Sequence, residues 1–230
     1  MNLKVIQSGV DRHSEREVRS MTVLERLCDI HDLRYIRLEN PIYRWTPPLD
    51  NIIDGRRDWY VGHTKPSNTF GLTPRHYGCF LSHKQSMGIG FMDNDHFLVC
   101  ECDLHIIDER LFIERLTEAV RLMDTTDYPM VRFESPNDCI RTLFYEQVSE
   151  NIFECNALLG THCYLVNGRS KGFWDNAFTD LGWHTADLWF NMLFERVQEK
   201  MLCFKDKLTH QYGGASAIDD LVKEDWDVAH

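Results

Sequence analysis

Residues 96–105 read HFLVCECDLH, an apolar run that ends in two carboxylates, Glu101 and Asp103, separated by one residue. The apolar part has the length and composition of a buried strand. Side chains two residues apart in an extended chain point to the same face, so the carboxylates are expected to converge on one cation while Cys100 and Cys102 face the other way. Ligands bind at the carboxyl ends of strands in open α/β sheets. Hard oxygen ligands at this place favour Mg²⁺ or Mn²⁺.

Two other interpretations of this segment stay open. Two acids at a strand end also occur where a turn is simply solvated, and their spacing alone does not separate that case from cation binding. In a further interpretation, Cys100, Cys102 and His105 form a zinc cluster, which needs a fourth ligand and requires both thiolates to leave the inner face of the strand.

The segments on either side of this run alternate between strand and helix patterns. Ser14 and Glu17 have the spacing of a capping box ahead of an apolar-periodic helix. The remaining predicted elements are strands at 3–6, 33–38, 130–133 and 161–166, and helices at 73–87, 109–123 and 185–200. Residues 40–73 are rich in Pro, Gly and aromatic residues and are expected to form a loop that is functional, mobile or both. The alternation predicts an α/β fold, a mostly parallel central sheet flanked by helices.

The composition limits the classes of function. The chain has 230 residues, 43% of them hydrophobic, which is enough for a full core. Lys and Arg number 25 against 36 Asp and Glu, a net charge of -11 that argues against a general affinity for nucleic acid or anionic membranes. A phosphate ligand would need placed basic residues, helix N-termini or a bound cation. No apolar run is long enough for a membrane span or signal peptide, so a cytoplasmic protein with reduced thiols is expected.

Residues 71–83, GLTPRHYGCFLSH, followed by residues 97–103, FLVCECD, resemble the core of glycosyltransferase family 25. That family includes lipopolysaccharide glycosyltransferases and collagen galactosyltransferases, and in it a Gly-Cys-x-x-Ser-His helix precedes a strand ending in Glu-Asp-Asp. Three further segments are similar to family segments, namely residues 5–16, 160–166 and 209–218. Cys102 stands where the family has its middle Asp, and residues 7–10 replace the usual Asn-Leu. Residues 40–73 have no alignable counterpart.

The resemblance implies a single Rossmann-type domain of the GT-A class over residues 1–230. Residues 1–105 would form the nucleotide-sugar half and residues 106–230 the acceptor half. The implied reaction is metal-dependent, inverting transfer of a hexose from a nucleoside-diphosphate sugar, with a UDP-sugar expected, to a glycan or glycoconjugate. The alternative is a non-catalytic nucleotide-sugar or glycan-binding protein on the same scaffold, which the altered Glu-Cys-Asp triplet motivates.

The resemblance also suggests roles for individual residues. For the cation we expect Glu101 and Asp103 with His210 as a third ligand, and for the catalytic base Asp187, with Asp219 or Asp220 as competitors. Expected nucleotide-sugar contacts are Gly9, Asp11, Arg12, Arg16, Ser82, His83 and Lys84. His83 has a second interpretation, in which it orients the strand that carries Glu101. Acceptor platforms are expected at Trp183 and Trp189, with Trp45 and Tyr60 as further candidates.

Overall fold

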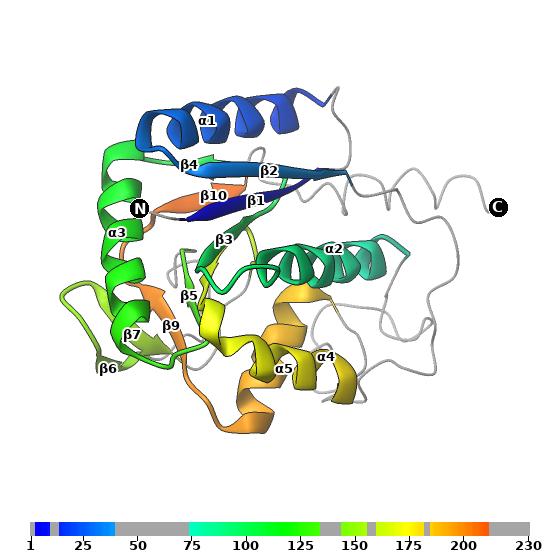
Figure 1. Ribbon diagram of the computed structural model, residues 1–230, viewed down its shortest axis with the longest axis vertical. Coiled ribbons are helices and arrows are strands. Elements are labelled where there is room, and N and C mark those ends of the chain that lie inside the picture. Colours follow the sequence, from blue (N-terminus) through cyan, green and yellow to red (C-terminus); the bar gives the residue numbers. More distant parts are fainter. Residues whose placement is uncertain are drawn as a thin grey trace, which may run out of the picture.

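The computed structural model describes residues 3–9, 14–39, 74–133, 144–155, 160–181 and 185–211. The predicted loop at residues 40–73 lies outside these ranges. Within them the chain forms an eight-stranded sheet and a separate two-stranded sheet (Figure 1).

The chain begins with the predicted strand, helix and strand: β1 (Lys4–Gly9), α1 (Glu15–His31) and β2 (Arg34–Glu39). Ser14 caps α1, because its Oγ accepts a hydrogen bond from the backbone N–H of Glu17 at 3.2 Å. β1 and β2 pair in parallel, which a crossover helix between them allows. The predicted β-α-β unit is confirmed.

The middle of the chain also follows the prediction, with one change. Its elements are α2 (Pro74–Gly90), β3 (Phe97–Cys100), β4 (Leu104–Ile106), α3 (Glu109–Thr125) and β5 (Met130–Arg132). Residues 101–103 form a turn rather than extended backbone, closed by a 3.4 Å hydrogen bond from Leu104 N to Glu101 O. The extended geometry expected across these residues is therefore wrong, and the chain leaves the sheet directly after Cys100.

The second half is richer in short elements than the sequence pattern indicated. They are β6 (Phe144–Gln147), β7 (Ile152–Cys155), β8 (Cys163–Val166), a 3₁₀ turn (Gly168–Ser170), α4 (Lys171–Asp180), α5 (Ala186–Val197), β9 (Met201–Phe204) and β10 (Thr209–Gln211). Of these, β8 and α5 were predicted. β10 pairs antiparallel with β4 and forms the small second sheet.

The central sheet has the strand order β2-β1-β3-β8-β5-β9-β7-β6. Following the pairings from β1, six strands run in one direction and two, β7 and β8, run in the other. The predicted class, an α/β fold with a mostly parallel central sheet flanked by helices, is confirmed. The antiparallel insertion of β8 between β3 and β5 was not predicted, and it matters for the site below.

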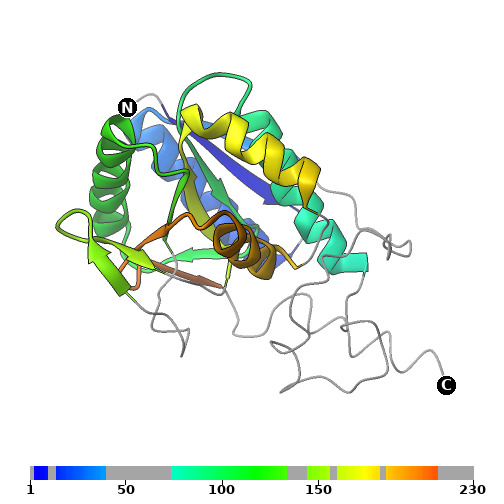
Figure 2. The same cartoon turned by 90° about the horizontal axis from the view of Figure 1, so that it is seen from below.

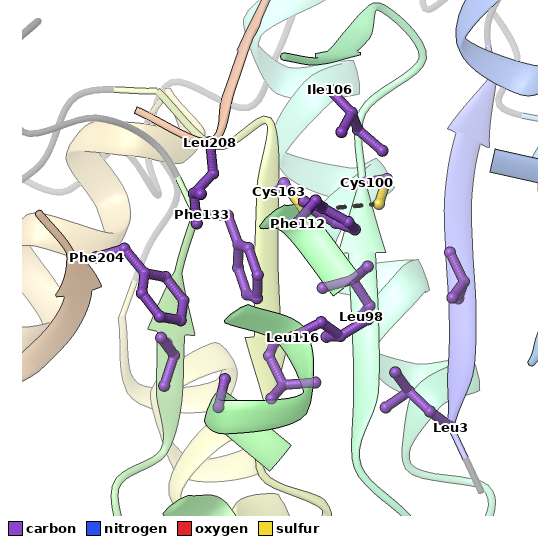
Figure 3. Packing of buried hydrophobic residues seen from close by; sticks show 14 of the residues in the cluster. Leu3, Leu98, Cys100, Ile106, Phe112, Leu116, Phe133, Cys163, Phe204 and Leu208 are labelled. Carbon is purple, nitrogen blue, oxygen red and sulfur yellow. Dashed lines mark hydrogen bonds between the residues drawn. The ribbon is translucent and has the colours of Figure 1, made fainter. Parts of the chain in front are cut away.

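Helices cover both faces of this sheet and produce two hydrophobic clusters (Figures 1 and 2). α2, α4 and α5 pack on one face, where Phe97 and Val99 of β3 point. α1 and α3 pack on the other, which receives Leu98 and Cys100 (Figure 3). Because side chains alternate along β3, its four residues are divided equally between the two clusters. Seven of the cysteines lie in the described ranges, and all seven are free thiols.

None of the described helices combines the length and the apolar character that a membrane crossing needs.

Candidate metal centre

Glu101 directly follows β3, at the carboxyl end of the strand. Because β8 runs antiparallel to β3, the residues that precede β8 lie beside this end, and Glu101 N donates a 2.9 Å hydrogen bond to His162 O. The carboxyl end of β1 lies at the same edge, since β1 is parallel to β3. One edge of the sheet therefore collects Glu101, His162 and Gly9.

Four side chains form a hydrogen-bonded network around the Glu101 carboxylate. Its Oε1 lies 3.1 Å from His83 Nε2 and accepts a hydrogen bond from Thr161, and its Oε2 lies 3.2 Å from His162 Nδ1. His83 is buried on α2, and its Nδ1 lies 2.8 Å from the hydroxyl of Tyr164 in β8. His83 is thus held between Glu101, which directly follows β3, and Tyr164 of β8.

This network keeps Glu101 ionised. Burial alone raises the pKa of Glu101, but the hydrogen bonds and charges of His162 and His83 outweigh it and hold the pKa well below its ordinary value. The interpretation of His83 as the residue that orients Glu101 is the one that these contacts support.

Asp103 has a different electrostatic environment, although it lies two residues away. It is 6% exposed, and burial, followed by repulsion from Glu101, raises its pKa to about 6. The positive charges of His162 and Arg16 partly offset this. Two carboxylates held this close, one of them with a raised pKa, are the arrangement that a divalent cation stabilises.

The donor set fits such a cation. Glu101, Asp103 and His162 each offer a ligand atom, and these atoms all lie within 4.8 Å of one another. Two carboxylates suit Mg²⁺ or Mn²⁺, whereas the imidazole nitrogen favours Mn²⁺, because Mg²⁺ takes oxygen ligands. The two predicted carboxylates therefore lie close together, and His162 completes a cluster of three potential ligands.

His210, the expected third ligand, lies nearby in the small sheet. It is the pairing partner of His105 across β10 and β4, and His105 Nδ1 lies 2.8 Å from His210 Nε2. Among the described residues, neither cluster of potential ligands includes His210. Its role as a metal ligand stays a prediction.

The zinc interpretation based on Cys100, Cys102 and His105 is not supported. Cys100 is 0% exposed and points into the α1/α3 cluster, where its Sγ lies 3.8 Å from Cys163 Sγ (Figure 3). Cys102 lies in the turn, half-buried. Burial, followed by the charge of Asp103, raises its pKa well above the ordinary value. These three residues do not form one of the ligand clusters of the described chain.

The residues expected to contact a nucleotide sugar separate into groups. Arg16, in the first turn of α1, is close enough to Asp103 for its charge to lower the pKa of that carboxyl. At Gly9, an added Cβ would lie 2.5 Å from Arg37 Nη2 and 2.6 Å from Glu17 Oε1, so the glycine makes room for this buried ion pair. Asp11 and Arg12 lie outside the described residues.

Two further residues of α2 have their contacts elsewhere. The Ser82 hydroxyl is buried and donates to Gly78 O of its own helix at 2.9 Å. Lys84 is exposed, with Nζ 5.5 Å from the ring centroid of Phe178 in α4. Of the three expected contacts on α2, the structure groups only His83 with Glu101.

The acceptor-side residues also divide. Asp187 lies in the first turn of α5, and its Oδ1 accepts from Leu188 N at 2.9 Å. Trp189 is 1% exposed and stacks on Phe178, with the rings 4.6 Å apart, so its indole belongs to the core and offers no free face to a sugar. The remaining candidates lie outside the described residues: Trp45, Tyr60, Trp183, Asp219 and Asp220.

His162, Thr161 and Tyr164 are the residues of this site that sequence reasoning did not assign. All three belong to the segment at residues 160–166, which was predicted as a strand and noted as similar to a family segment. A His and a Thr directly before a buried strand were the available signal. Their meaning depends on β8 pairing with β3, which no local pattern specifies.

Comparison with known proteins gives no family. No family model matches the chain, and no curated protein matches it. Assignment to glycosyltransferase family 25 therefore stays a prediction.

Several solved structures are distantly similar to this chain. A glycosyltransferase involved in the glycosylation of the major capsid of PBCV-1 is 12% identical, with a TM-score of 0.45 over 97% of this chain and 99% of that one. A mutant of Drosophila β1,4-galactosyltransferase 7 in complex with manganese, UDP-Gal and xylobiose is 9% identical, with a TM-score of 0.45 over 93% and 72%. The galactosyltransferase LgtC with donor and acceptor sugar analogues is 15% identical, with a TM-score of 0.40 over 83% and 70%. These similarities are distant, so the function has to be inferred from this chain's own residues.

Proposed function

We propose that this protein is a Mn²⁺-dependent glycosyltransferase of the GT-A class that uses a nucleoside-diphosphate sugar. The observation that carries the proposal is the convergence of Glu101, Asp103 and His162 at the carboxyl edge of the sheet. The resemblance of residues 71–83 and 97–103 to glycosyltransferase family 25 supports the same function. An acidic protein needs a local source of positive charge to accept a diphosphate, and a cation bound at these residues provides it.

The residues around the centre have distinct tasks on the donor side. When bound, the cation supplies Lewis-acid stabilisation of the negative charge that develops on the departing diphosphate. Glu101 and Asp103 hold it, and His83 and Thr161 fix the Glu101 carboxylate by hydrogen bonds. Arg16 adds a positive charge near Asp103, where it would pair with a phosphate oxygen of the donor.

On the acceptor side, Asp187 is the proposed general base. Burial is the main reason that the pKa of Cys79 is raised, and the charges of Glu101 and Asp187 both add to it, so both carboxylates are close enough to act on this thiol. In the proposed inverting reaction, the acceptor oxygen forms a bond to the anomeric carbon as its proton passes to Asp187. The bond from that carbon to the diphosphate oxygen breaks, and its electron pair leaves with the nucleoside diphosphate.

The proposed site uses both halves of the single domain expected over residues 1–230. Glu101 and Asp103 close the donor half at residues 1–105, whereas His162 and Asp187 come from residues 106–230. The halves therefore share one catalytic centre, and a UDP-hexose donor and a glycan or glycoconjugate acceptor are its proposed substrates.

The test is to compare the wild type with Asp103→Asn for binding and turnover. In the wild type, Mn²⁺ should raise the melting temperature further in the presence of a nucleoside diphosphate, because ligands that bind only the folded state stabilise it. In Asp103→Asn, the Mn²⁺-stimulated release of nucleoside diphosphate should fall by roughly 10²–10³-fold, the usual cost of removing an electrostatic stabiliser.

A matched control and two contrary outcomes complete this test. Asp206→Asn removes an exposed carboxylate, paired with Arg115, and should leave Mn²⁺ binding unchanged. Unchanged Mn²⁺ stimulation in Asp103→Asn would overturn the assignment of the metal centre. Nucleotide binding that is insensitive to chelators, without sugar transfer, would indicate the non-catalytic binding protein instead.

A further inference from the structure

We propose that Cys79, His83 and Glu101 form a second cation site, selective for Zn²⁺ and related thiophilic ions, next to the Mn²⁺ centre. One potential ligand atom of each residue lies within 4.8 Å of the other two. The site does not depend on the proposed transferase activity, because it is defined by its own ligands and can be detected by metal binding alone.

The nitrogen ligand of this site, His83, and its sulfur ligand, Cys79, come from one helix. Cys79 and His83 are four residues apart on α2, so they lie on the same face, one turn apart. His83 already points its Nε2 at Glu101, and the Tyr164 hydroxyl at its Nδ1 fixes the orientation of the ring. Metal-binding histidines generally have such a partner on the second nitrogen. The helix and the sheet therefore hold two of the three ligands in place before an ion binds.

The surroundings of Cys79 are strongly negative. Burial raises the pKa of this thiol well above its ordinary value, and the charges of Glu101 and Asp187 are the next largest causes. The same field that disfavours a thiolate favours a divalent cation beside it. Cys79 is half-buried and the Glu101 side chain is 15% exposed, so the cluster is not sealed inside the core.

The donor set distinguishes this site from the neighbouring one. A thiolate, an imidazole and a carboxylate are all ligand types that Zn²⁺ takes, whereas a thiolate is a poor ligand for Mn²⁺ and Mg²⁺. Binding releases the Cys79 thiol proton. It also requires Nε2 of His83 to be unprotonated. The Nδ1 atom then carries the proton and donates a hydrogen bond to the Tyr164 hydroxyl oxygen.

Glu101 connects the two sites. Its Oε1 contacts His83, whereas its Oε2 contacts His162, the third member of the Mn²⁺ centre. A Zn²⁺ ion must displace the hydrogen bond between His83 and Oε1, which is the bond that orients Glu101 for the other centre. Zn²⁺ binding should therefore weaken Mn²⁺ binding.

The experiment is a titration of the purified protein with Co²⁺, a spectroscopic substitute for Zn²⁺. A thiolate ligand produces a sulfur-to-cobalt charge-transfer band in the near ultraviolet, which Zn²⁺ should remove by competition. Cys79→Ser should lose this band and weaken Zn²⁺ binding by at least about 10-fold. Circular dichroism of each variant verifies that it is folded.

Two matched variants separate this site from its neighbours. Cys102→Ser replaces the other half-buried thiol near Glu101 and should keep the band. Asp103→Asn should weaken Mn²⁺ binding and keep the band as well. A folded wild type without the band, or a band that survives in Cys79→Ser, would overturn the proposal. Absence of transferase activity with the band present would contradict only the proposed function.

Discussion

Two sides of one strand pair differ sharply in chemistry. On the side covered by α1 and α3, β3 and β8 place Cys100 against Cys163, with the sulfur atoms 3.8 Å apart among apolar side chains (Figure 3). Glu101 directly follows Cys100, and His162 directly precedes Cys163; there, Glu101 contacts His162 and, from α2, His83. The first pair is inert core, and the second is the candidate metal centre.

The comparison shows how two adjacent residues at the end of one strand enter different chemical environments. Neighbouring residues face opposite clusters, so a thiol and a carboxylate that are adjacent in sequence end in separate environments. Cys79 extends the contrast, because it is a thiol on the polar side, near Glu101 and Asp187. The environment of a cysteine here, rather than its presence, decides whether it can bind a metal.

The largest expected effect comes from the apolar side. Leu98 is 1% exposed and packs in the cluster beneath α1 and α3, so Leu98→Ala should lower the free energy of unfolding by about 2–5 kcal/mol. Chemical denaturation measures this change. Mn²⁺ affinity of the folded fraction should stay near the wild-type value. A large loss of Mn²⁺ affinity at unchanged stability would show that the two sides are not independent.

A smaller effect is expected when the support of Glu101 is removed. His83→Asn loses the hydrogen bond to Glu101 while an amide remains near Tyr164, and it should weaken Mn²⁺ binding by about 10–100-fold. His83→Gln, whose amide nitrogen reaches further, should restore part of the affinity. Isothermal titration with Mn²⁺ measures both variants. Equal affinity in the wild type and both variants would mean that His83 does not position Glu101.

Mn²⁺ binding should also depend on pH through Asp103. Its pKa is raised to about 6, whereas Glu101 stays ionised, so below pH 6 protons compete with the cation for Asp103. Affinity should fall about tenfold between pH 7 and pH 5. His162 and Arg16 both oppose protonation of Asp103. Asp103→Asn should bind more weakly with a shallower pH dependence, and an identical slope in both proteins would contradict the assignment.

The raised pKa of Asp103 also makes the stability of the metal-free protein depend on pH, in the opposite direction to Mn²⁺ affinity. Because folding raises the pKa of Asp103, its favourable contribution to stability is present at low pH and lost as the pH rises through about 6. The difference in melting temperature between Asp103→Asn and the wild type should therefore be larger at pH 7 than at pH 5. A constant difference would mean that Asp103 titrates at its ordinary value.

The smallest effect is expected for the buried thiols. Cys100→Ala removes one sulfur atom from the apolar cluster and should cost about 1 kcal/mol of stability. The cobalt band assigned to Cys79 should be unchanged, since Cys100 faces away from it. Loss of that band in Cys100→Ala would show that the cobalt site depends on Cys100 and would contradict its assignment to Cys79.

Much of the first half of the fold was predictable because its signals are local. The Ser14 cap, the apolar period of α1 and the short apolar run of β3 act within one or two turns of chain, and the structure confirms each of them. The carboxylate pair was predictable for the same reason. The expected geometry was nevertheless wrong, because Leu104 turns away to pair with β10.

The second half of the fold was harder to predict, because its short strands are stabilised by pairing with neighbouring strands rather than by a local sequence signal. β7 and β9 have four residues each and pair with one another, and only β9 also pairs with a predicted strand, β5. Trp189 shows the same limit for side chains, since an aromatic residue at helical spacing suits a sugar platform or a core equally well. Its stacking on Phe178 of α4, a helix that was not predicted, decides for the core.

The sequence by itself determined the α/β class, the end of β3 and the presence of two acids there, because periodicity and turn chemistry act locally. Tertiary structure decided which imidazoles join them. His83 comes from α2, and His162 directly precedes the antiparallel strand β8. The contact of His162 with Glu101 joins residues 61 positions apart, so it depends on the packing of the whole sheet. The burial that raises the pKa of Asp103 and the partners that lower that of Glu101 likewise exist only after folding.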